Sequence, residues 1–294
     1  MPSVEHEEIV ALFSGGLGLQ ALSVAEQRAA MEASADMFPV ADDVVVTQTD
    51  ARGVPADWIS VADSDPGRVI LYLHGGAYSL GSRNTHRGLA GRIARAARAT
   101  VLLPDYRLAP EHPFPAAVED AASCWRWLVS EGYAPGRMVL AGDSAGGGLA
   151  LATLLALKAA GDALPACGVV FSPWTDLEGT GPTAVPGAVD DPLLTPEGLQ
   201  GNGQLYAAND LRHPFASPLY GDLAGLPPLL MQVGTREILL SDSTRFADKA
   251  RDAGVPVCLE IEDGLIHVWQ MFAGVPEAER AISRVGAFVM EICP

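Results

Sequence analysis

Cysteine is scarce in this 294-residue sequence. The four cysteines stand far apart and form no C-x-x-C pair, at positions Cys124, Cys167, Cys258 and Cys293. This spacing argues against a disulfide framework or a cysteine-based zinc site. The six histidines are also dispersed and form no cluster with ligand spacing, so we expect no metal. We predict reduced cysteines that serve as packing residues in a cytoplasmic protein.

Basic residues are few as well. The chain has 19 Lys and Arg against 36 Asp and Glu, a formal net charge of −17, which argues against nucleic acid or an anionic membrane as partner. No apolar run reaches the roughly 18 residues that a membrane span needs. The acidic start of the chain lacks the basic residues and apolar core of a secretory signal. We therefore expect no membrane association.

What the sequence does contain is a regular alternation of buried-strand and helix patterns. The continuous apolar run at 69–73 is typical of a strand covered on both faces, and further strand patterns stand at 100–103, 138–141, 167–171, 229–233 and 257–261. Helical patterns separate or follow them, at 87–99, 116–129, 150–160, 244–253 and 277–292. This order predicts an α/β fold with a doubly wound, mostly parallel sheet. Two strand patterns at 44–47 and 58–61, around a turn, predict an antiparallel start.

One segment interrupts the alternation. Residues 178–213 hold four prolines and two short helical patterns but no strand pattern, and an insertion of this length is typical of a lid. Helical patterns at 9–13 and 24–37 flank Gly15, Gly16 and Gly18 near the start of the chain. We predict a helical cap made of 1–40 and 178–213. The catalytic domain is predicted to comprise residues 41–177 and 214–294.

A serine motif follows the apolar run at 138–141. The residues Gly142-Asp143-Ser144-Ala145-Gly146 predict a tight turn from strand to helix that exposes the Ser144 hydroxyl at the tip of the sheet. Gly142 and Gly146 are the small residues that such a turn tolerates. We predict that Ser144 is a nucleophile.

A serine nucleophile needs a base to take its proton, and in this kind of fold the base follows the serine in the chain. Only His213 and His267 qualify. His213 lies in the 178–213 segment, before the strand that should carry the acid. His267 follows the last predicted strand, so we predict that His267 is the base.

The base in turn needs an acid to orient it, expected after the strand at 229–233. Glu237 and Asp242 are both candidates. Glu237 is nearer the strand end, whereas Asp242 is placed to begin the next helix as its N-cap. We predict that Glu237 orients His267.

The tetrahedral intermediate of acyl transfer needs hydrogen-bond donors for its oxyanion. The N–H of Ala145, directly after the nucleophile, and those of Gly75, Gly76 and Ala77 are predicted to supply them. His74 is predicted to brace this loop rather than to transfer a proton.

Three charged residues are predicted to have structural roles. Asp143 lies beside the nucleophile, but alternation along the turn points its side chain away from the substrate. Asp105 and Arg107 are predicted to brace the loop beneath the site, as an ion pair or through hydrogen bonds.

The substrate pocket is the least specified part of the site. Five apolar or aromatic residues neighbour predicted strand ends: Tyr78, Trp174, Phe215, Leu240 and Trp269. Each fits two interpretations, a wall of the acyl or alcohol site and an ordinary packing residue.

Three motifs together resemble a known family. His74-Gly-Gly-Ala-Tyr78, Gly142-Asp-Ser-Ala-Gly-Gly147 and the long stretch Asp105-Tyr-Arg-Leu-Ala-Pro-Glu-His-Pro-Phe-Pro-Ala116 are similar to those of bacterial hormone-sensitive-lipase-like (family IV) esterases of the α/β-hydrolase superfamily. The resemblance covers about 69–290. It implies hydrolysis of short-acyl carboxylic esters through an acyl-enzyme, without a cofactor. It also implies a homodimer through the last strand and its neighbouring helix.

Carried over residue by residue, the resemblance makes Ser144 the nucleophile, Glu237 the acid and His267 the base. Two positions depart from the family pattern. Ala77 stands where the family often has glycine, which leaves the backbone N–H in place. Glu237 stands where the family often has Asp, which adds one methylene.

Other activities share the same residues. Lactone hydrolysis, removal of acetyl groups and amide cleavage use the same triad, so the motifs do not separate them. A non-catalytic binder of small ligands and a lipase of long-chain fats are further alternatives. The presence of both His267 and Glu237 argues against the binder, and the acidic composition argues against the lipase.

Overall fold

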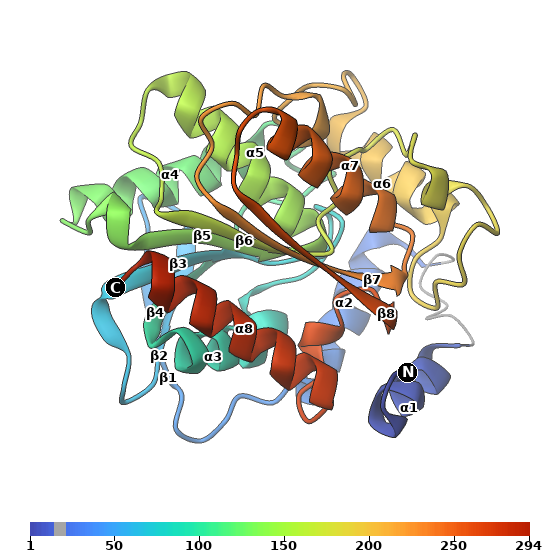
Figure 1. The fold of residues 1–294 in the computed structure, drawn as a ribbon, viewed down its shortest axis with the longest axis horizontal. Helices are drawn as coiled ribbons and strands as arrows, with labels where there is room; N and C mark the ends of the chain where they lie inside the picture. The colour runs from blue at the N-terminus through green and yellow to red at the C-terminus, as the bar shows by residue number, and fades with distance from the viewer. Residues whose placement is uncertain (15–21) are drawn as a thin grey trace.

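The computed structural model describes residues 1–14 and 22–294, and its centre is one eight-stranded sheet (Figure 1). The strand order is β1-β2-β4-β3-β5-β6-β7-β8. Their bounds are β1 Val45–Asp50, β2 Pro55–Ser60, β3 Asp65–Leu73, β4 Ala99–Pro104, β5 Met138–Asp143, β6 Cys167–Phe171, β7 Leu229–Arg236 and β8 Val257–Ile266. Strand β2 runs antiparallel to both of its neighbours, and the other pairs are parallel. The predicted α/β fold with a mostly parallel sheet and an antiparallel start is confirmed.

The central strands are mostly apolar because helices cover both faces of the sheet. Every residue of β5 and β6 is buried. Strand β8 differs, since β7 is its only neighbour among the described residues and exposed positions recur along it. The predicted strand stops at 261, but pairing with β7 continues past a register shift to Ile266.

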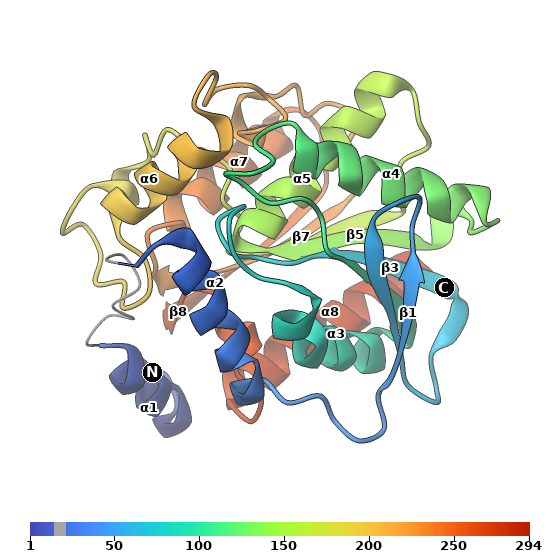
Figure 2. The ribbon, with the colours of Figure 1, turned by 180° about the vertical axis from the view of Figure 1, so that it is seen from behind.

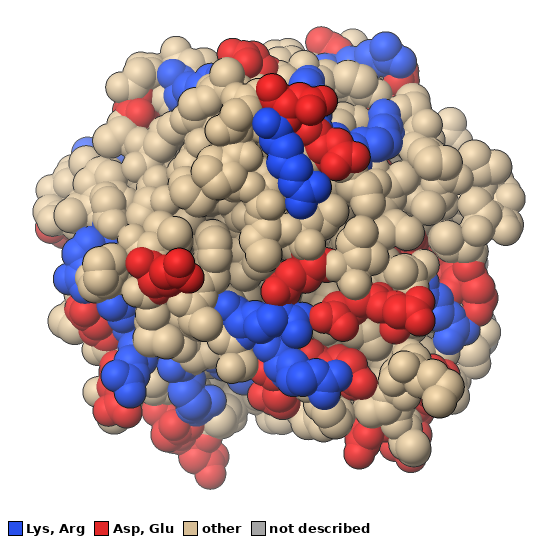
Figure 3. Space-filling model, in the orientation of Figure 1, with Lys and Arg blue, Asp and Glu red and all other residues tan. Residues whose placement is uncertain are grey.

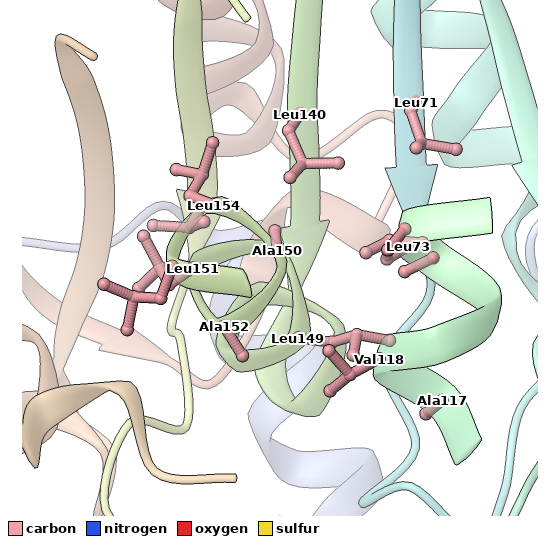
Figure 4. Packing of buried hydrophobic residues seen from close by; sticks show 14 of the residues in the cluster. Leu71, Leu73, Ala117, Val118, Leu140, Leu149, Ala150, Leu151, Ala152 and Leu154 are labelled. Carbon is pink, nitrogen blue, oxygen red and sulfur yellow. The ribbon is translucent and has the colours of Figure 1, made fainter. Parts of the chain in front are cut away.

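Helices pack on both sides of the sheet (Figure 2). Helices α3 (Arg83–Ala97) and α8 (Pro276–Ile292) contribute to the core on one face. Helices α4 (Ala116–Ser130), α5 (Ser144–Ala160) and α7 (Leu240–Asp252) contribute to the core on the other. Figure 4 shows leucine and alanine side chains of α5 gathered beside the strands, with Leu149 next to Val118 of α4.

Helix α5 begins six residues earlier than predicted. Three glycines in its first turns, Gly146, Gly147 and Gly148, conceal the helical pattern because glycine is a poor helix former. They are needed for close packing: a Cβ on Gly146 would collide with the carbonyl oxygens of Leu73 and His74. A Cβ on Gly148 would collide with that of Trp174.

Three further helices lie outside the sheet layers. Helices α1 (Val4–Phe13) and α2 (Val24–Ala33) come from the start of the chain, and α6 (Pro196–Ala207) comes from the 178–213 segment. The predicted helix over 24–37 ends at Ala33 and continues as a 3-10 turn, Ser34–Met37. Gly15, Gly16 and Gly18 lie outside the described residues. The division into a catalytic domain and a cap stays a prediction.

In Figure 3, acidic and basic side chains lie next to one another rather than in fields of one sign. The four cysteines are free thiols; Cys124, Cys167 and Cys293 are buried, but Cys258 is exposed because it lies on the edge strand β8. The packing interpretation is therefore wrong for Cys258. None of the helices in the described ranges is long and apolar enough to cross a membrane.

Candidate active site

The turn from β5 to α5 presents Ser144. Its backbone is left-handed, with φ of 53°, a conformation that costs an L-residue about 1–2 kcal/mol. A Cβ on Gly142 would collide with the carbonyl oxygen of Gly146, so only glycine permits this close approach. The turn places the hydroxyl at the carboxyl end of the central strand, where the next strands also end.

Two side chains from neighbouring strand ends complete a hydrogen-bonded chain. His267, directly after β8, has Nε2 at 2.9 Å from Ser144 Oγ. Its Nδ1 lies 2.9 Å from Oε2 of Glu237, which follows β7. Glu237 is fully buried and His267 nearly so. The structure thus brings together the three residues predicted as nucleophile, base and acid.

The surroundings of His267 favour its protonated form. Burial alone would lower the pKa of His267, but the hydrogen bond and the negative charge of Glu237 outweigh that effect and raise it above its usual value. A raised pKa makes the imidazole a better proton acceptor. The same carboxylate would stabilise the imidazolium when it forms.

A residue absent from the sequence predictions holds Glu237 in place. Ser172, directly after β6, donates from Oγ to Glu237 Oε1 at 2.8 Å. The same Oγ accepts the N–H of Val268, next to the histidine, at 3.2 Å. The N–H of Gly234 donates to Glu237 Oε1 at 2.6 Å. A polar residue directly after a wholly apolar strand was the available signal for Ser172.

The loop at 74–81, which we call the oxyanion loop, turns beside the nucleophile. Its backbone is left-handed at three successive residues, with φ of 124° at Gly76, 54° at Ala77 and 60° at Tyr78. Among the residues that the structure describes, no acceptor is assigned to the N–H of Gly76 or Ala77. The N–H of Ala145 lies in the first turn of α5, where helical donors have no partner within the helix.

Gly75 departs from its predicted role. Its N–H donates to Asp143 Oδ1 at 3.1 Å and approaches His86 Nε2 at 3.3 Å, so it is not free to bind an oxyanion. The sequence alone does not show which backbone N–H groups already donate hydrogen bonds within the protein.

Asp143 and His74 are both buried, and the structural roles predicted for them stay predictions. Asp143 accepts a 2.8 Å hydrogen bond from the Tyr72 hydroxyl in addition to that from Gly75. Burial opposes ionisation of Asp143, but the contact with His86 and the Tyr72 hydrogen bond lower its pKa. His74 stacks on Tyr106 with ring centres 4.3 Å apart, and burial lowers the pKa of His74 to about 4.

Asp242, the alternative acid, lies elsewhere. It does not cap α7, whose N-cap is Leu239. Its Oδ2 instead accepts the N–H groups of Thr175 and Asp176, at 2.7 and 2.8 Å. Burial and the charge of Asp176 raise the pKa of Asp242 to about 7. The N-cap interpretation is wrong because the helix begins earlier than predicted.

Asp105 and Arg107 brace the structure but not as a pair. Asp105 binds Arg83, with Oδ2 at 2.6 Å from Nε. Arg107 binds Asp120, whose Oδ1 lies 2.8 Å from Nη2. The predicted loop is held through partners on α3 and α4.

A cleft of about 250 Å³ lies between α6 and α7. Trp174 lines it, together with Leu177, Leu199 and Leu239 among others. The other four predicted pocket residues are not among its lining residues. Tyr78 is buried against Tyr206, Phe215 lies against His213, Leu240 is the first residue of α7, and Trp269 packs in a cluster with α1 and α8.

His213 also stays away from the nucleophile, and its Nδ1 accepts the N–H of Phe215 at 3.1 Å. Within 1–14 and 22–294, no group of three or more His, Cys, Asp or Glu side chains is placed to hold a metal ion.

Comparison with known proteins agrees with this architecture. The model of the alpha/beta hydrolase fold family matches residues 70–271. An acetyl-hydrolase of Streptomyces hygroscopicus is 48% identical over 236 residues, covering 80% of this chain and 79% of that protein. An esterase of Acinetobacter venetianus is 38% identical over 259 residues, covering 87% and 85%.

Solved structures extend the likeness over the whole chain. The crystal structure of an esterase from the bacterial hormone-sensitive lipase family has a TM-score of 0.96 and 43% identity, covering all of both chains. The esterase EstE5, soaked with p-nitrophenyl butyrate, has a TM-score of 0.94 and 42% identity over 99% of each chain.

The chain therefore belongs to the α/β-hydrolase fold family and, within it, to the bacterial hormone-sensitive-lipase-like esterases. It is an enzyme of the carboxylic-ester hydrolase class.

Proposed function

We propose that the enzyme hydrolyses short-acyl esters of small, uncharged alcohols through an acyl-enzyme on Ser144. The observation that carries this proposal is the continuous chain from Glu237 through His267 to Ser144, with both hydrogen bonds at 2.9 Å. No other described histidine lies within hydrogen-bond distance of the Ser144 hydroxyl.

The proposed reaction has two steps, acylation of Ser144 and hydrolysis of the acyl-enzyme. As Ser144 Oγ attacks the ester carbonyl, its proton passes to Nε2 of His267, and the carbonyl electron pair moves to oxygen. The N–H groups of Gly76, Ala77 and Ala145 stabilise that oxyanion. When the intermediate collapses, the imidazolium gives its proton to the departing alkoxide. Water then attacks the acyl-enzyme by the same route, and carboxylic acid and free Ser144 result.

The choice of a small acyl group is supported by comparison and not by the cleft of about 250 Å³, because neither Ser144 nor His267 lines that cleft. The similar protein from Streptomyces is named an acetyl-hydrolase, which favours acetyl as one accepted acyl group. Lactone hydrolysis with the same residues stays the alternative.

A series of p-nitrophenyl esters from acetate to palmitate tests the proposal. We expect the highest kcat/KM at short chains and at least ~10³-fold less activity in Ser144→Ala. Ser130→Ala, at an exposed serine whose hydroxyl donates to Trp127 O at the end of α4, is the matched control and should keep full activity. Retained turnover in Ser144→Ala would refute the mechanism, and a maximum at palmitate would refute the substrate class.

A homodimer is proposed through the outer edge of β8. This edge has no neighbouring strand among the described residues, and Ile261 on it is 48% exposed. Unpaired strand edges are ready to pair with a second copy. Light scattering of wild type and Ile261→Lys tests this: a dimer that becomes monomeric supports it, and a wild-type monomer refutes it.

A further inference from the structure

The oxyanion loop has a conformation that its sequence does not favour by itself. Ala77 and Tyr78 both have left-handed backbones, with φ of 54° and 60°. A residue with a side chain is disfavoured there, whereas glycine adopts the conformation freely. Something outside these two residues must therefore hold the loop.

The loop's own hydrogen bonds account for part of this. The N–H groups of Ser79 and Leu80 both donate to the carbonyl of Gly76, at 3.0 and 2.8 Å. These bonds close a turn at Gly76. They do not involve the side chains of Tyr78 and Ser79, which contact other parts of the protein.

Helix α6 supplies two of these contacts. The ring of Tyr206 stacks on that of Tyr78, with centroids 3.7 Å apart and planes inclined by 1°. Ser79 Oγ donates to Asn202 Oδ1 at 2.8 Å. The other end of the Asn202 amide is fixed, because its nitrogen donates to Gly198 O at 2.9 Å.

Helix α2 supplies a third contact through a single arginine. Arg28 Nε donates to the carbonyl of Ser79 at 2.8 Å, and its Nη2 donates to that of Ala109 at 2.7 Å. The N–H of Ala109 in turn donates to the carbonyl of Tyr78 at 2.9 Å. Glu111 accepts from both terminal nitrogens of Arg28, at 2.8 and 2.7 Å, and fixes the guanidinium.

We propose that Arg28, Asn202 and Tyr206 are positioning residues that hold Ala77 and Tyr78 in the left-handed conformation needed for the oxyanion hole. Helices α2 and α6 then control the chemical step itself, in addition to any role in covering the substrate. The inference rests on the proposed function, since it assumes that the N–H groups of Gly76 and Ala77 bind the oxyanion.

The test is a double-mutant cycle with Ala77→Gly, measured as kcat and KM on p-nitrophenyl acetate. We expect Arg28→Ala and Asn202→Leu each to lower kcat by about 10-fold, less than the ~10²–10³-fold for loss of a whole oxyanion donor. KM should change by less than about 3-fold, because the loop acts on the transition state. In the Ala77→Gly background the same substitutions should cost fewer-fold in kcat than in the wild type, because glycine needs no support at positive φ whereas Tyr78 still does.

Matched control variants show whether a loss of kcat comes from a lost contact with the oxyanion loop or from any substitution in α2 or α6. Gln204→Ala changes an exposed residue of α6, and Gln27→Ala removes a side chain of α2 whose amide donates to Leu22 O. Both should keep wild-type kcat. Ser79→Ala and Asn202→Leu break one shared hydrogen bond, so their combination should cost no more than either alone.

Each outcome decides the question. Equal losses in the wild-type and Ala77→Gly backgrounds, or losses confined to KM, would overturn the proposal. If Arg28→Ala does not fold, Arg28→Lys serves instead, because lysine keeps the charge near Glu111 but lacks the planar donors. Ser144→Ala is measured alongside: activity there refutes the proposed mechanism, whereas an inactive Ser144→Ala with fully active Arg28 variants refutes only the positioning role.

Discussion

The two halves of the candidate active site are built by different means. The acid–base half consists of side chains at the ends of β6, β7 and β8, and Ser172, Glu237 and His267 hold one another by hydrogen bonds. The oxyanion half consists of backbone N–H groups, whose direction depends on φ at Gly76 and Ala77. Substitution in the acid–base half should therefore change the proton affinity of His267. Substitution in the oxyanion half should change the direction of the N–H groups.

Replacing Glu237 with Gln gives the largest expected effect on the acid–base half. We expect kcat to fall about 10³–10⁴-fold, because the imidazolium loses its carboxylate partner. Wild-type activity should fall as pH drops through the raised pKa of His267, since the base must be neutral. In Glu237→Gln this acidic limb should move to lower pH, because the group that raises the pKa is gone. The pH profile of kcat/KM checks this, and an unmoved limb would contradict it.

Replacing Gly75 with Ala probes the oxyanion half. The added Cβ would collide with the Asp143 carboxylate, which forces the loop to shift. We expect about 10²-fold lower kcat, as for a lost oxyanion donor, with the acidic limb of the pH profile unchanged. Gly136→Ala is the control, because a Cβ there meets nothing within 4 Å and the position precedes β5, at the opposite end of that strand from Ser144. A shifted acidic limb in Gly75→Ala would break the distinction between the halves.

Ser172→Ala gives a smaller effect on the acid–base half. It removes one hydrogen bond to Glu237 and one to the N–H of Val268. Hydrogen bonds to charged groups contribute about 1.5–3 kcal/mol, and because the Gly234 N–H still binds the same carboxylate oxygen we expect the lower end of that range, roughly 10-fold lower kcat. Ser172→Thr keeps the hydroxyl, and better activity than in Ser172→Ala would support the assignment. Equal activity of Ser172→Ala and wild type would show that Gly234 alone holds the carboxylate.

Gly201→Ala should have the smallest effect and lies outside both halves. This glycine is within α6, and a Cβ there meets nothing within 4 Å. Alanine should stabilise the protein by up to about 1 kcal/mol in urea unfolding, since glycine is a poor helix former. Activity should stay at the wild-type value. Lower activity would show that α6 must deform during turnover.

The sequence was most informative where a pattern is local. Apolar runs located the core strands, and the turn around Ser144 followed from its glycines. Features that depend on contacts between distant parts of the chain could not be predicted from the sequence. The glycines at the start of α5, for example, are explained only by the carbonyl groups that they approach in the structure. The engagement of the Gly75 N–H by Asp143 and the place of Trp269 beside α1 likewise depend on tertiary packing. The catalytic roles of Ser144, Glu237 and His267 stay predictions until they are tested.

The start of α5 at Ser144 has an electrostatic consequence. Aligned peptide dipoles in a helix give its N-terminus about half a positive charge, and this 17-residue helix begins at the nucleophile. The positive end therefore lies where negative charge would develop on the reacting carbonyl. Ala145 is fully buried there, so dissolved ions screen the field only weakly. The helix that carries the serine would then lower the free energy of the charged intermediate without contributing a single charged side chain to the first turn.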